Sequence, residues 1–535
     1  MEAVLFLAFP LVLAFWAGIM INWRLGVYGL VAYTPFTGLV VAVLYPSPVG
    51  TLVRDILVVV PLYLSFFLLG RQARYARVPP LLYAVYGLLA LIVLFAAANP
   101  GVPNLMVAGI GVKVWLSYIP MLIVGASFIR HEQDLRDFLR ALVVSAWIPW
   151  AVGIFLFIGA TVYDYEPLAR FFFGDYAVIA TSEFGAFEGY GAKLFRIPGT
   201  FQFNSQYGVF CFFMLFPILM LLEIERERRW RAFIWLSMVV GLVAGFTSGA
   251  RGNFLLMPLI FVIVQFFKFR AGGMIQGIIG IGGGLIAALA ISGIDGSKMY
   301  GEVGTLTARY SQEMGAGGML EAMARGGIFG RGVGANTGAA RHGLDAATAA
   351  LLKSEGGMVE SYYAKSMVEL GVIGFTILLA CLLLTLFACL RMQFQIRPGP
   401  LRGAAACGTA MAAFVLVVSV KGWALDTEPL NYYYYLLLGM VFALPYVDRR
   451  MAAAVPAQAS GRTAPPIDTA DAAAPPVTVP QPRPVMAGRP YRPLIGRNGY
   501  YGEIAKRRPA PLPSAPVDER FPGRPERGDP KDATS

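Results

Sequence analysis

The amino-acid sequence predicts an all-α polytopic membrane protein with about 13 transmembrane helices, a large periplasmic loop domain and a disordered cytoplasmic tail. Composition is the first observation: 57% of the 535 residues are apolar and 14% are charged, whereas an average soluble domain has about 25% charged residues. Second, the apolar residues form repeated continuous runs that are long enough to cross a hydrocarbon core of about 30 Å. The strands of a membrane barrel would instead alternate apolar and polar residues. Third, basic residues recur in every second connection between the runs.

The apolar runs define the expected spans. They lie near residues 3–21, 26–45, 53–70, 80–98, 106–129, 139–160, 203–222, 231–247, 252–267, 275–292, 366–390, 404–420 and 430–446. The first run has Glu2 ahead of it and no basic segment, so we interpret it as a span and not as a cleavable signal.

The basic residues between the runs predict the orientation. Alternate connections carry Arg24; Arg71, Arg74 and Arg77; Arg130, Arg136 and Arg140; Arg226, Arg228, Arg229 and Arg231; Lys268 and Arg270; and Arg391, Arg397 and Arg402. The other short connections carry Arg54, Arg251, Lys421 or no basic residue. Because cytoplasmic loops are enriched in Lys and Arg, the N-terminus is expected outside and the C-terminus inside.

Two long connections, 161–200 and 293–361, fall on the predicted outer side. Long loops in compact proteins are usually functional or disordered, and these contain Phe, Tyr, Met and Leu throughout, so we expect them to be folded and functional. A helix is expected at Met319–Arg325. The predicted organisation is therefore ten helices in residues 1–292, the large periplasmic loop in 293–361, and three more helices in 362–450.

The C-terminal segment 451–535 differs from the rest of the chain. It contains 17 of the 36 prolines and few large aliphatic residues, so it cannot bury enough apolar surface to fold. We expect a disordered cytoplasmic tail. Its basic cluster at 506–508 is either solvated or in contact with anionic lipid.

Several classes of site are disfavoured. The four cysteines form no CxxC pair and there are only two histidines, so neither a metal site nor a disulfide framework is expected, and no cofactor is predicted. The net charge of +12 follows the topology pattern and does not indicate nucleic acid. The glycine-rich string at 330–334 does not follow a strand of a βαβ unit, which disfavours a nucleotide-binding loop.

Cations at the outer ends of spans are candidate phosphate ligands. Arg251 lies in a tight turn of small residues, where its guanidinium can form paired bonds to phosphate oxygens; the alternative is an interface arginine. Arg196 leads into the seventh span, with Asn204 and Gln206 just beyond it, and forms either a headgroup site or a turn. Lys113 stands in the first turn of the fifth span and either binds phosphate or extends to the interface.

The second long loop contributes Arg309, Arg331 and Glu360. Glu360 precedes the eleventh span, where a carboxylate could act as a general base or could complement the helix dipole. Glu369 follows slightly inside that span.

Four segments together resemble the superfamily of O-antigen ligases and Wzy-type polysaccharide polymerases. They are Arg196-x-x-Gly199-Thr200-Phe201 with Asn204; Ser248-Gly249-Ala250-Arg251-Gly252; Arg309 ahead of Gly330-x-Gly332-Val333-Gly334; and Glu360-Ser361-Tyr362-Tyr363 running to Glu369-Leu370-Gly371-Val372-Ile373-Gly374. The resemblance covers roughly residues 190–385, and the earlier spans only by topology.

The resemblance implies a metal-independent membrane glycosyltransferase without a cofactor. Its donor would be a glycan on undecaprenyl pyrophosphate, at the periplasmic face of a bacterial inner membrane. The pyrophosphate would be held by the cations Arg196, Arg251, Arg309, Arg331 and Lys113. Membrane lipid would surround it, and a flippase and a chain-length regulator are candidate partners.

This chain departs from the family where many ligases carry a histidine, often followed by Asn, because it has Glu360-Ser361 there. The base could be Glu360, His342 or neither. The departure favours a polymerase of exopolysaccharide or O-antigen repeat units over a ligase. A polysaccharide or lipid transporter and a receptor-like scaffold are the competing classes, although no inverted repeat is evident.

Overall fold

The computed structural model describes residues 2–70, 77–181, 186–189, 192–249, 253–269, 316–336, 361–420, 422 and 425–459. They belong to one compact unit, Met1–Pro465, and the second unit, Pro466–Ser535, lies outside the described residues. The unit is helical, apart from one short hairpin among the described residues. Its helices are α1 (Glu2–Ile21), α2 (Trp23–Tyr33), α3 (Thr37–Leu44), α4 (Val60–Tyr63), α5 (Pro80–Ala97), α6 (Leu105–Leu116), α7 (Met121–Phe128), α8 (Glu132–Val162), α9 (Tyr165–Phe173), α10 (Ala177–Ala180), α11 (Asn204–Phe213), α12 (Leu215–Ile224), α13 (Arg228–Thr247), α14 (Asn253–Phe267), α17 (Ala316–Gly326), α19 (Tyr362–Phe394), α20 (Pro400–Val418) and α21 (Leu430–Ala459).

The polytopic membrane architecture is confirmed by ten helical segments that are long and apolar enough to span a bilayer. They are Trp23–Leu44, Val49–Leu69, Pro80–Ala97, Leu105–Phe128, Glu132–Val162, Asn204–Ile224, Arg228–Thr247, Tyr362–Phe394, Pro400–Val418 and Leu430–Ala453. Two further apolar helices are shorter, Pro10–Ile21 and Leu256–Phe267. The predicted run 275–292 lies outside the described residues, so the count of 13 stays a prediction.

Several spans are interrupted where the sequence places proline. The segment 23–44 passes through a 3₁₀ turn, Thr34–Phe36, that contains Pro35. The segment 105–128 is divided into α6 and α7, and Pro120 caps α7. The span 49–69 contains two π-helical stretches, Asp55–Val59 and Leu64–Leu69, on either side of α4. Proline removes a main-chain donor, so these helices bend or restart at it.

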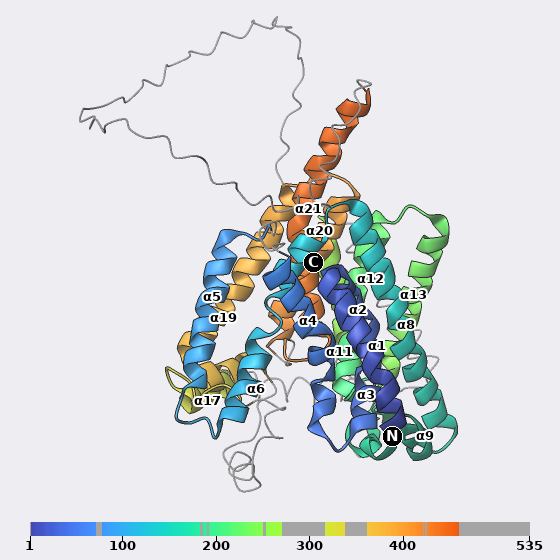
Figure 1. Cartoon of the computed structure of the whole chain (residues 1–535), viewed down its shortest axis with the longest axis vertical. Helices are drawn as coiled ribbons and strands as arrows, with labels where there is room; N and C mark the ends of the chain where they lie inside the picture. The colour runs from blue at the N-terminus through green and yellow to red at the C-terminus, as the bar shows by residue number, and fades with distance from the viewer. Residues whose placement is uncertain are drawn as a thin grey trace, which may run out of the picture. The chain divides into compact units, whose positions relative to one another are not determined.

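Helix α21 lies at the centre of the bundle. Figure 1 shows α20 and α21 between a group formed by α5, α6, α17 and α19 and a group that includes α8, α12 and α13. All four tyrosines of α21 at 432–435 are buried. Glycines allow α7 and α21 to approach closely: a Cβ on Gly125 would lie 2.1 Å from the carbonyl oxygen of Leu436, and one on Gly439 would lie 2.1 Å from that of Leu122. Small residues have this role in membrane helix packing.

The two ends of the bundle differ in charge. We call the end that carries Arg24, Arg77, Arg140, Lys268 and Arg397 the basic face. Ion pairs join neighbouring helices there, including Arg140 with Glu225 at 2.8 Å, Lys268 with Glu223 at 2.8 Å and Arg397 with Asp448 at 3.1 Å. Helices α9 and α17 lie at the other end, which we call the opposite face, while the C-terminal part of α21 projects at the basic face (Figure 1).

The connection 161–200 contains α9, α10 and an antiparallel hairpin of β1 (Ala186–Gly189) and β2 (Ala192–Phe195). The hairpin register pairs Ala186 with Phe195. The predicted helix at Met319–Arg325 is present within α17. Helix α21 continues to Ala459, beyond Met451, where the tail was expected to begin, and the rest of the expected tail lies outside the described residues. The Ala-rich sequence of α21 after Met451 favours continuation of the helix.

Candidate functional site

The segment that contains Arg196 packs against the turn that leads toward Arg251. The main-chain amide of Ile197 donates to the carbonyl oxygen of Ser248 at 3.3 Å. Gly249 has φ 72°, and a Cβ there would lie 2.2 Å from the carbonyl oxygen of Phe195. This turn therefore requires glycine, both for its conformation and for the close approach. Arg251 itself lies outside the described residues, two positions beyond Gly249.

Buried hydrogen bonds fix this junction from below. The side-chain nitrogen of Asn253, Nδ2, donates to Oγ of Ser248 at 3.1 Å and to the carbonyl oxygens of Gly245 and Gly208 at 3.1 and 3.3 Å. Asn253 is 2% exposed. One side chain thus ties α11, the end of α13 and the start of α14 together, so the turn between α13 and α14 is held at both ends.

Arg196 is exposed above this junction. Its main chain is fixed by the hydroxyl of Tyr165, which donates to the Arg196 carbonyl oxygen at 2.8 Å. Gly199, with φ 58°, lies against the ring of Tyr207. The backbone is therefore positioned by α9 and α11, while the guanidinium lies at the surface of the opposite face.

The glycine-rich loop 327–336 docks into a break in α19. Gly371 interrupts the helix with φ 72° and ψ −175°. Four main-chain hydrogen bonds join the two segments across this break: Arg331 N to Val368 O, Gly332 N to Glu369 O, Val372 N to Gly327 O, and Ile373 N to Ile328 O, at 2.8 to 3.3 Å. The loop thus satisfies main-chain groups that an unbroken helix would pair internally.

The glycines of this loop serve close packing. Gly330, Gly332 and Gly334 all have positive φ, and Gly334 lies against Val107 of α6. The loop follows helix α17 and not a strand. Nε of Arg331 donates to the carbonyl oxygen of Arg325 in the last turn of α17 at 2.9 Å. The side chain of Arg331 therefore contributes to ending that helix.

Glu369 lies behind the docked loop and is fully buried. Its Oε2 accepts a hydrogen bond from Nε1 of Trp115 at 2.7 Å, and its Oε1 accepts one from the main-chain amide of Asn336 at 2.8 Å. One turn earlier in α19, Lys365 is also fully buried and forms an ion pair with Asp426, which lies between α20 and α21. Burial raises the pKa of Asp426, Lys365 lowers it and Glu369 raises it further, so the net pKa is above its ordinary value.

A second charge group, centred on buried Arg54, lies between the span 49–69, α6 and the start of α21. Nη2 of Arg54 donates to Oδ1 of Asp55 and to Oε1 of Glu428, both at 2.7 Å. Its guanidinium lies 4.5 Å from the ring centroid of Tyr432. Lys113 forms an ion pair with Asp55. Lys113 of this group and Trp115 of the Glu369 group are two residues apart on α6. We call the two neighbouring groups together the buried charge network.

The buried charge network was largely missed by sequence analysis, which treated Lys113 as a separate candidate. The missed residues are Arg54, Asp55, Lys365, Asp426 and Glu428. The available signal was an ionisable residue inside or beside an apolar run, which is costly in a membrane and usually functional. In the structure, Lys113 forms an ion pair with Asp55, and Arg331 donates a hydrogen bond to the last turn of α17. Of the remaining candidates, Arg309, His342 and Glu360 lie outside the described residues, as Arg251 does.

The site offers cations and buried carboxylates. Among the described residues, no group of three or more His, Cys, Asp or Glu side chains could hold a metal ion. Ser361 begins α19, and its Oγ accepts the main-chain amide of Ala364 at 3.3 Å; the residue before it is Glu360. The arrangement of exposed Arg196 beside the Ser248–Gly249 turn suits binding of an anionic group at the opposite face.

No protein-family model matches the chain, and no curated protein matches it.

Proposed function

We propose that this chain is a metal-independent glycosyltransferase that polymerises undecaprenyl-pyrophosphate-linked oligosaccharide repeat units of an exopolysaccharide or O-antigen. The supporting observation is the packing of the Phe195–Ile197 segment against Ser248–Gly249. Two segments that resemble the polymerase and ligase superfamily, far apart in the sequence, meet there. Each carries an arginine, at 196 and at 251.

The chemistry requires stabilisation of a leaving group. Glycosyl transfer from a pyrophosphate develops negative charge on the departing oxygens, and preplaced guanidinium groups stabilise that charge without a metal. Paired N–H groups of arginine match phosphate oxygens. We assign the main pyrophosphate contacts to Arg196 and Arg251. We assign Lys113, which is paired with Asp55, and Arg331, which bonds the end of α17, a supporting electrostatic role together with Arg309. The main role of Arg196 rests on its exposure at the opposite face and its place beside the Ser248–Gly249 turn.

We assign the general base to Glu360, which precedes the capped start of α19. A base near the pyrophosphate site would activate the acceptor hydroxyl of the next repeat unit. Energy would come from the activated donor. A flippase that supplies the donor and a chain-length regulator are the candidate partners.

We place the reaction at the periplasmic face of a bacterial inner membrane. The distribution of arginines supports a cytoplasmic basic face, so the opposite face, with α9 and α17, would be periplasmic and the C-terminus cytoplasmic. Labelling of single-cysteine variants with a membrane-impermeant maleimide tests this orientation. All four native cysteines are buried, which keeps the background low. Exposure of residue 170 or 321 only after permeabilisation would contradict the placement.

A transporter is the second candidate, and the buried charge network favours it, because ionisable residues within a bundle mark ion or substrate pathways.

A ligase is the alternative within the first class. The polysaccharide of a deletion strain separates all three. Single repeat units on the acceptor mean a lost polymerase, full-length polymer left on the carrier lipid means a lost ligase, and repeat units that stay on the cytoplasmic leaflet mean a lost transporter.

The sharper experiment uses purified protein and a lipid-linked repeat unit. We expect Arg251→Ala and Arg251→Lys each to lower turnover about a hundredfold, since lysine lacks the planar fork. Arg196→Ala should lower it similarly. Arg170→Ala is the matched control, because Arg170 is exposed on α9 at the same face and pairs with Glu166. Glu360→Gln should abolish turnover with donor binding preserved.

Two results would count against this assignment. Full activity of Arg251→Lys with normal donor binding would make Arg251 an interface residue. Loss of transfer in EDTA, restored by a divalent ion, would require a metal that the proposed mechanism does not use.

A further inference from the structure

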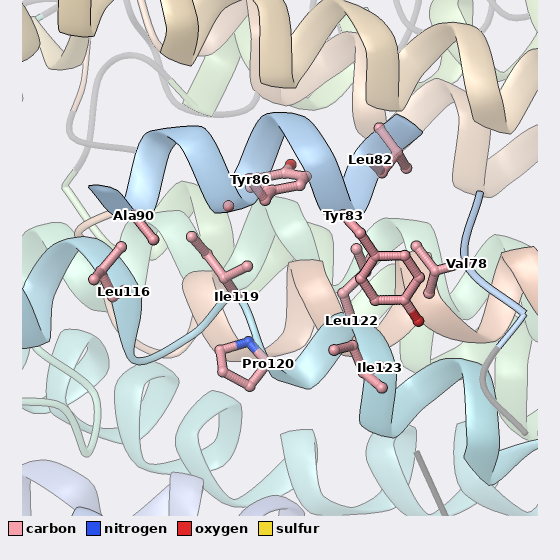
Figure 2. A pocket seen from close by; sticks show the side chains of 11 residues that line it. Val78, Leu82, Tyr83, Tyr86, Ala90, Leu116, Ile119, Pro120, Leu122 and Ile123 are labelled. Carbon is pink, nitrogen blue, oxygen red and sulfur yellow. The ribbon is translucent and has the colours of Figure 1, made fainter. Parts of the chain in front are cut away.

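An apolar groove lies on the outside of the bundle between α5 and the α6–α7 segment. Its volume is about 280 Å³. Figure 2 shows Tyr86 and Ile119 in its middle, Ala90 and Leu116 toward one end, and Val78 and Ile123 toward the other. All these side chains are apolar or aromatic. The groove therefore offers hydrocarbon contacts and no fixed polar partner along its length.

The groove is open to the surface at Tyr83 and Gly87, two lining residues of α5 that are exposed. Beside the groove, Leu81, Leu88, Leu91 and Leu94 of α5 are each 44 to 65% exposed, as expected for a helix face in contact with membrane hydrocarbon. Gly87 lines the groove, and a Cβ built on it would meet nothing within 4 Å. The absence of a side chain at 87 thus leaves space in the groove that a residue of ordinary size would fill.

The groove lies within the depth of one leaflet, and a cation directly precedes its lining in the sequence. The lining residues of α5, from 82 to 90, rise about 12 Å at 1.5 Å per residue, slightly less than half of a hydrocarbon core of about 30 Å. Val78, at one end, directly follows Arg77 of the basic face. Arg77 is exposed, and its guanidinium lies 3.8 Å from the ring centroid of Tyr446. Within the described part of the chain it forms no ion pair with a carboxylate.

We propose that this groove binds one acyl chain of an anionic phospholipid from the leaflet at the basic face, with the lipid phosphate at Arg77. Charge complementarity selects the anionic headgroup, since a basic side chain at the membrane surface attracts anionic lipid. Tyr83, which is 42% exposed at the same end, has the amphipathic character of residues at the headgroup level. The assignment is independent of the proposed glycosyl transfer and concerns the other face of the bundle.

Photolabelling of the purified full chain tests the proposal. The probe is phosphatidylglycerol with a diazirine in the middle of one acyl chain, and the labelled peptides are mapped by mass spectrometry. We expect label on the segments 80–97 and 116–123. Gly87→Trp should reduce that labelling about tenfold or more, because it fills the space of several methylene groups. Gly87→Leu is the second variant, used if the tryptophan variant does not fold.

The matched control is Gly109→Trp. Gly109 is an exposed glycine of α6 whose added Cβ would also meet nothing within 4 Å, but it does not line the groove, so labelling should be unchanged. Arg77→Ala should raise the half-saturating probe concentration about fivefold. Equal labelling of wild type and both Gly87 variants would overturn the site. Equal half-saturation with a diazirine-labelled diacylglycerol would overturn the role of the phosphate.

Competition identifies the occupant. Unlabelled phosphatidylglycerol should displace the probe. If an unlabelled C55 polyprenyl phosphate displaced it and phosphatidylglycerol did not, the groove would be an isoprenoid site and the proposal would be wrong.

Discussion

Nε1 of Trp115 donates a hydrogen bond of 2.7 Å to Oε2 of Glu369, so a buried carboxylate joins α6 to the first part of α19. The other oxygen of Glu369 holds the main chain of Asn336, at the end of the glycine-rich loop. A single side chain thus links three segments that are distant in sequence. The two bonds explain why a carboxylate is retained at a fully buried position.

Removing either partner of this bond should destabilise the protein. We expect Glu369→Gln and Trp115→Phe each to lower the free energy of unfolding by about 1.5–3 kcal/mol, because each leaves a buried polar group unsatisfied or weakens a bond to a charged acceptor. Thermal unfolding in detergent measures the effect. Glu321→Gln, an exposed residue of α17, is the control and should change stability by less than about 0.5 kcal/mol. Strictly additive losses in the double variant would contradict direct coupling.

Breaking the Lys365–Asp426 ion pair should lower the free energy of unfolding by an amount that depends on pH. Lys365→Met leaves Asp426 as a buried carboxyl beside Glu369, and we expect a loss of about 3–5 kcal/mol near pH 8. The pKa of Asp426 is already raised by burial, and without Lys365 it rises further. As the pH falls through that raised pKa Asp426 takes up a proton, so the loss in free energy of unfolding relative to wild type should shrink as the pH is lowered. A loss independent of pH would show that Asp426 does not carry the charge responsible. Asp426→Asn in the Lys365→Met background should recover part of the stability at pH 8.

The break in α19 should be intolerant of a side chain. Gly371→Ala places a Cβ at φ 72°, 2.2 Å from the carbonyl oxygen of Ile328 and 2.4 Å from the amide nitrogen of Gly330. Strain and the forced displacement of the docked loop should cost about 2 kcal/mol or more. Gly109→Ala, in an open helical position, should change stability by less than about 1 kcal/mol. Equal melting temperatures for the two variants would mean that the loop and α19 are not packed as described.

Glu225 at the basic face should stabilise the protein only above acidic pH. Burial raises its pKa, but hydrogen bonds from Arg140 and from the amides of Arg226 and Glu227 outweigh this, so the net pKa lies below the ordinary 4.5. The stabilisation is therefore complete above pH 4.5 and is lost as the pH falls through the folded-state pKa. Glu225→Gln should lower the free energy of unfolding by about 1–3 kcal/mol at pH 7. Below pH 4 the free energies of unfolding of the variant and of wild type should become more similar. A constant difference down to pH 3 would exclude this origin.

The helical membrane architecture was predictable because the solvent imposes it: continuous apolar runs leave the helix as the structure that satisfies their main-chain groups. Twelve of the 13 predicted runs, counted over the described residues, coincide with apolar helices. The breaks within individual helices were not predicted, because hydropathy does not depend on backbone conformation. Gly371 lies within an apolar run, and its conformation depends on a loop about 40 residues earlier.

The buried charge network was beyond sequence analysis for a related reason. Arg54 appeared as a lone basic residue in a short outer connection, and Glu428 as an unremarked acid before the last span. Their proximity depends on how α6, α21 and the span 49–69 assemble. The motif pairing of Arg196 with the Ser248 turn, by contrast, was expected only through the resemblance, and no local pattern in either segment indicates it.

The bond between Arg54 and Glu428 spans 374 residues, and this separation has a consequence for biosynthesis. At about 5–20 residues per second, a ribosome needs roughly 20 to 75 s to reach Glu428 after Arg54 has been made. During that interval Arg54, near one end of the span Val49–Leu69, is without its distant partner, and an unpaired charged side chain in contact with membrane hydrocarbon is costly. Asp55 is the one counter-charge already present, adjacent in the chain and bonded to the same guanidinium. The Arg54-Asp55 dipeptide therefore inserts as a self-neutralised unit, and the arrival of the last helix converts a temporary arrangement into the final one.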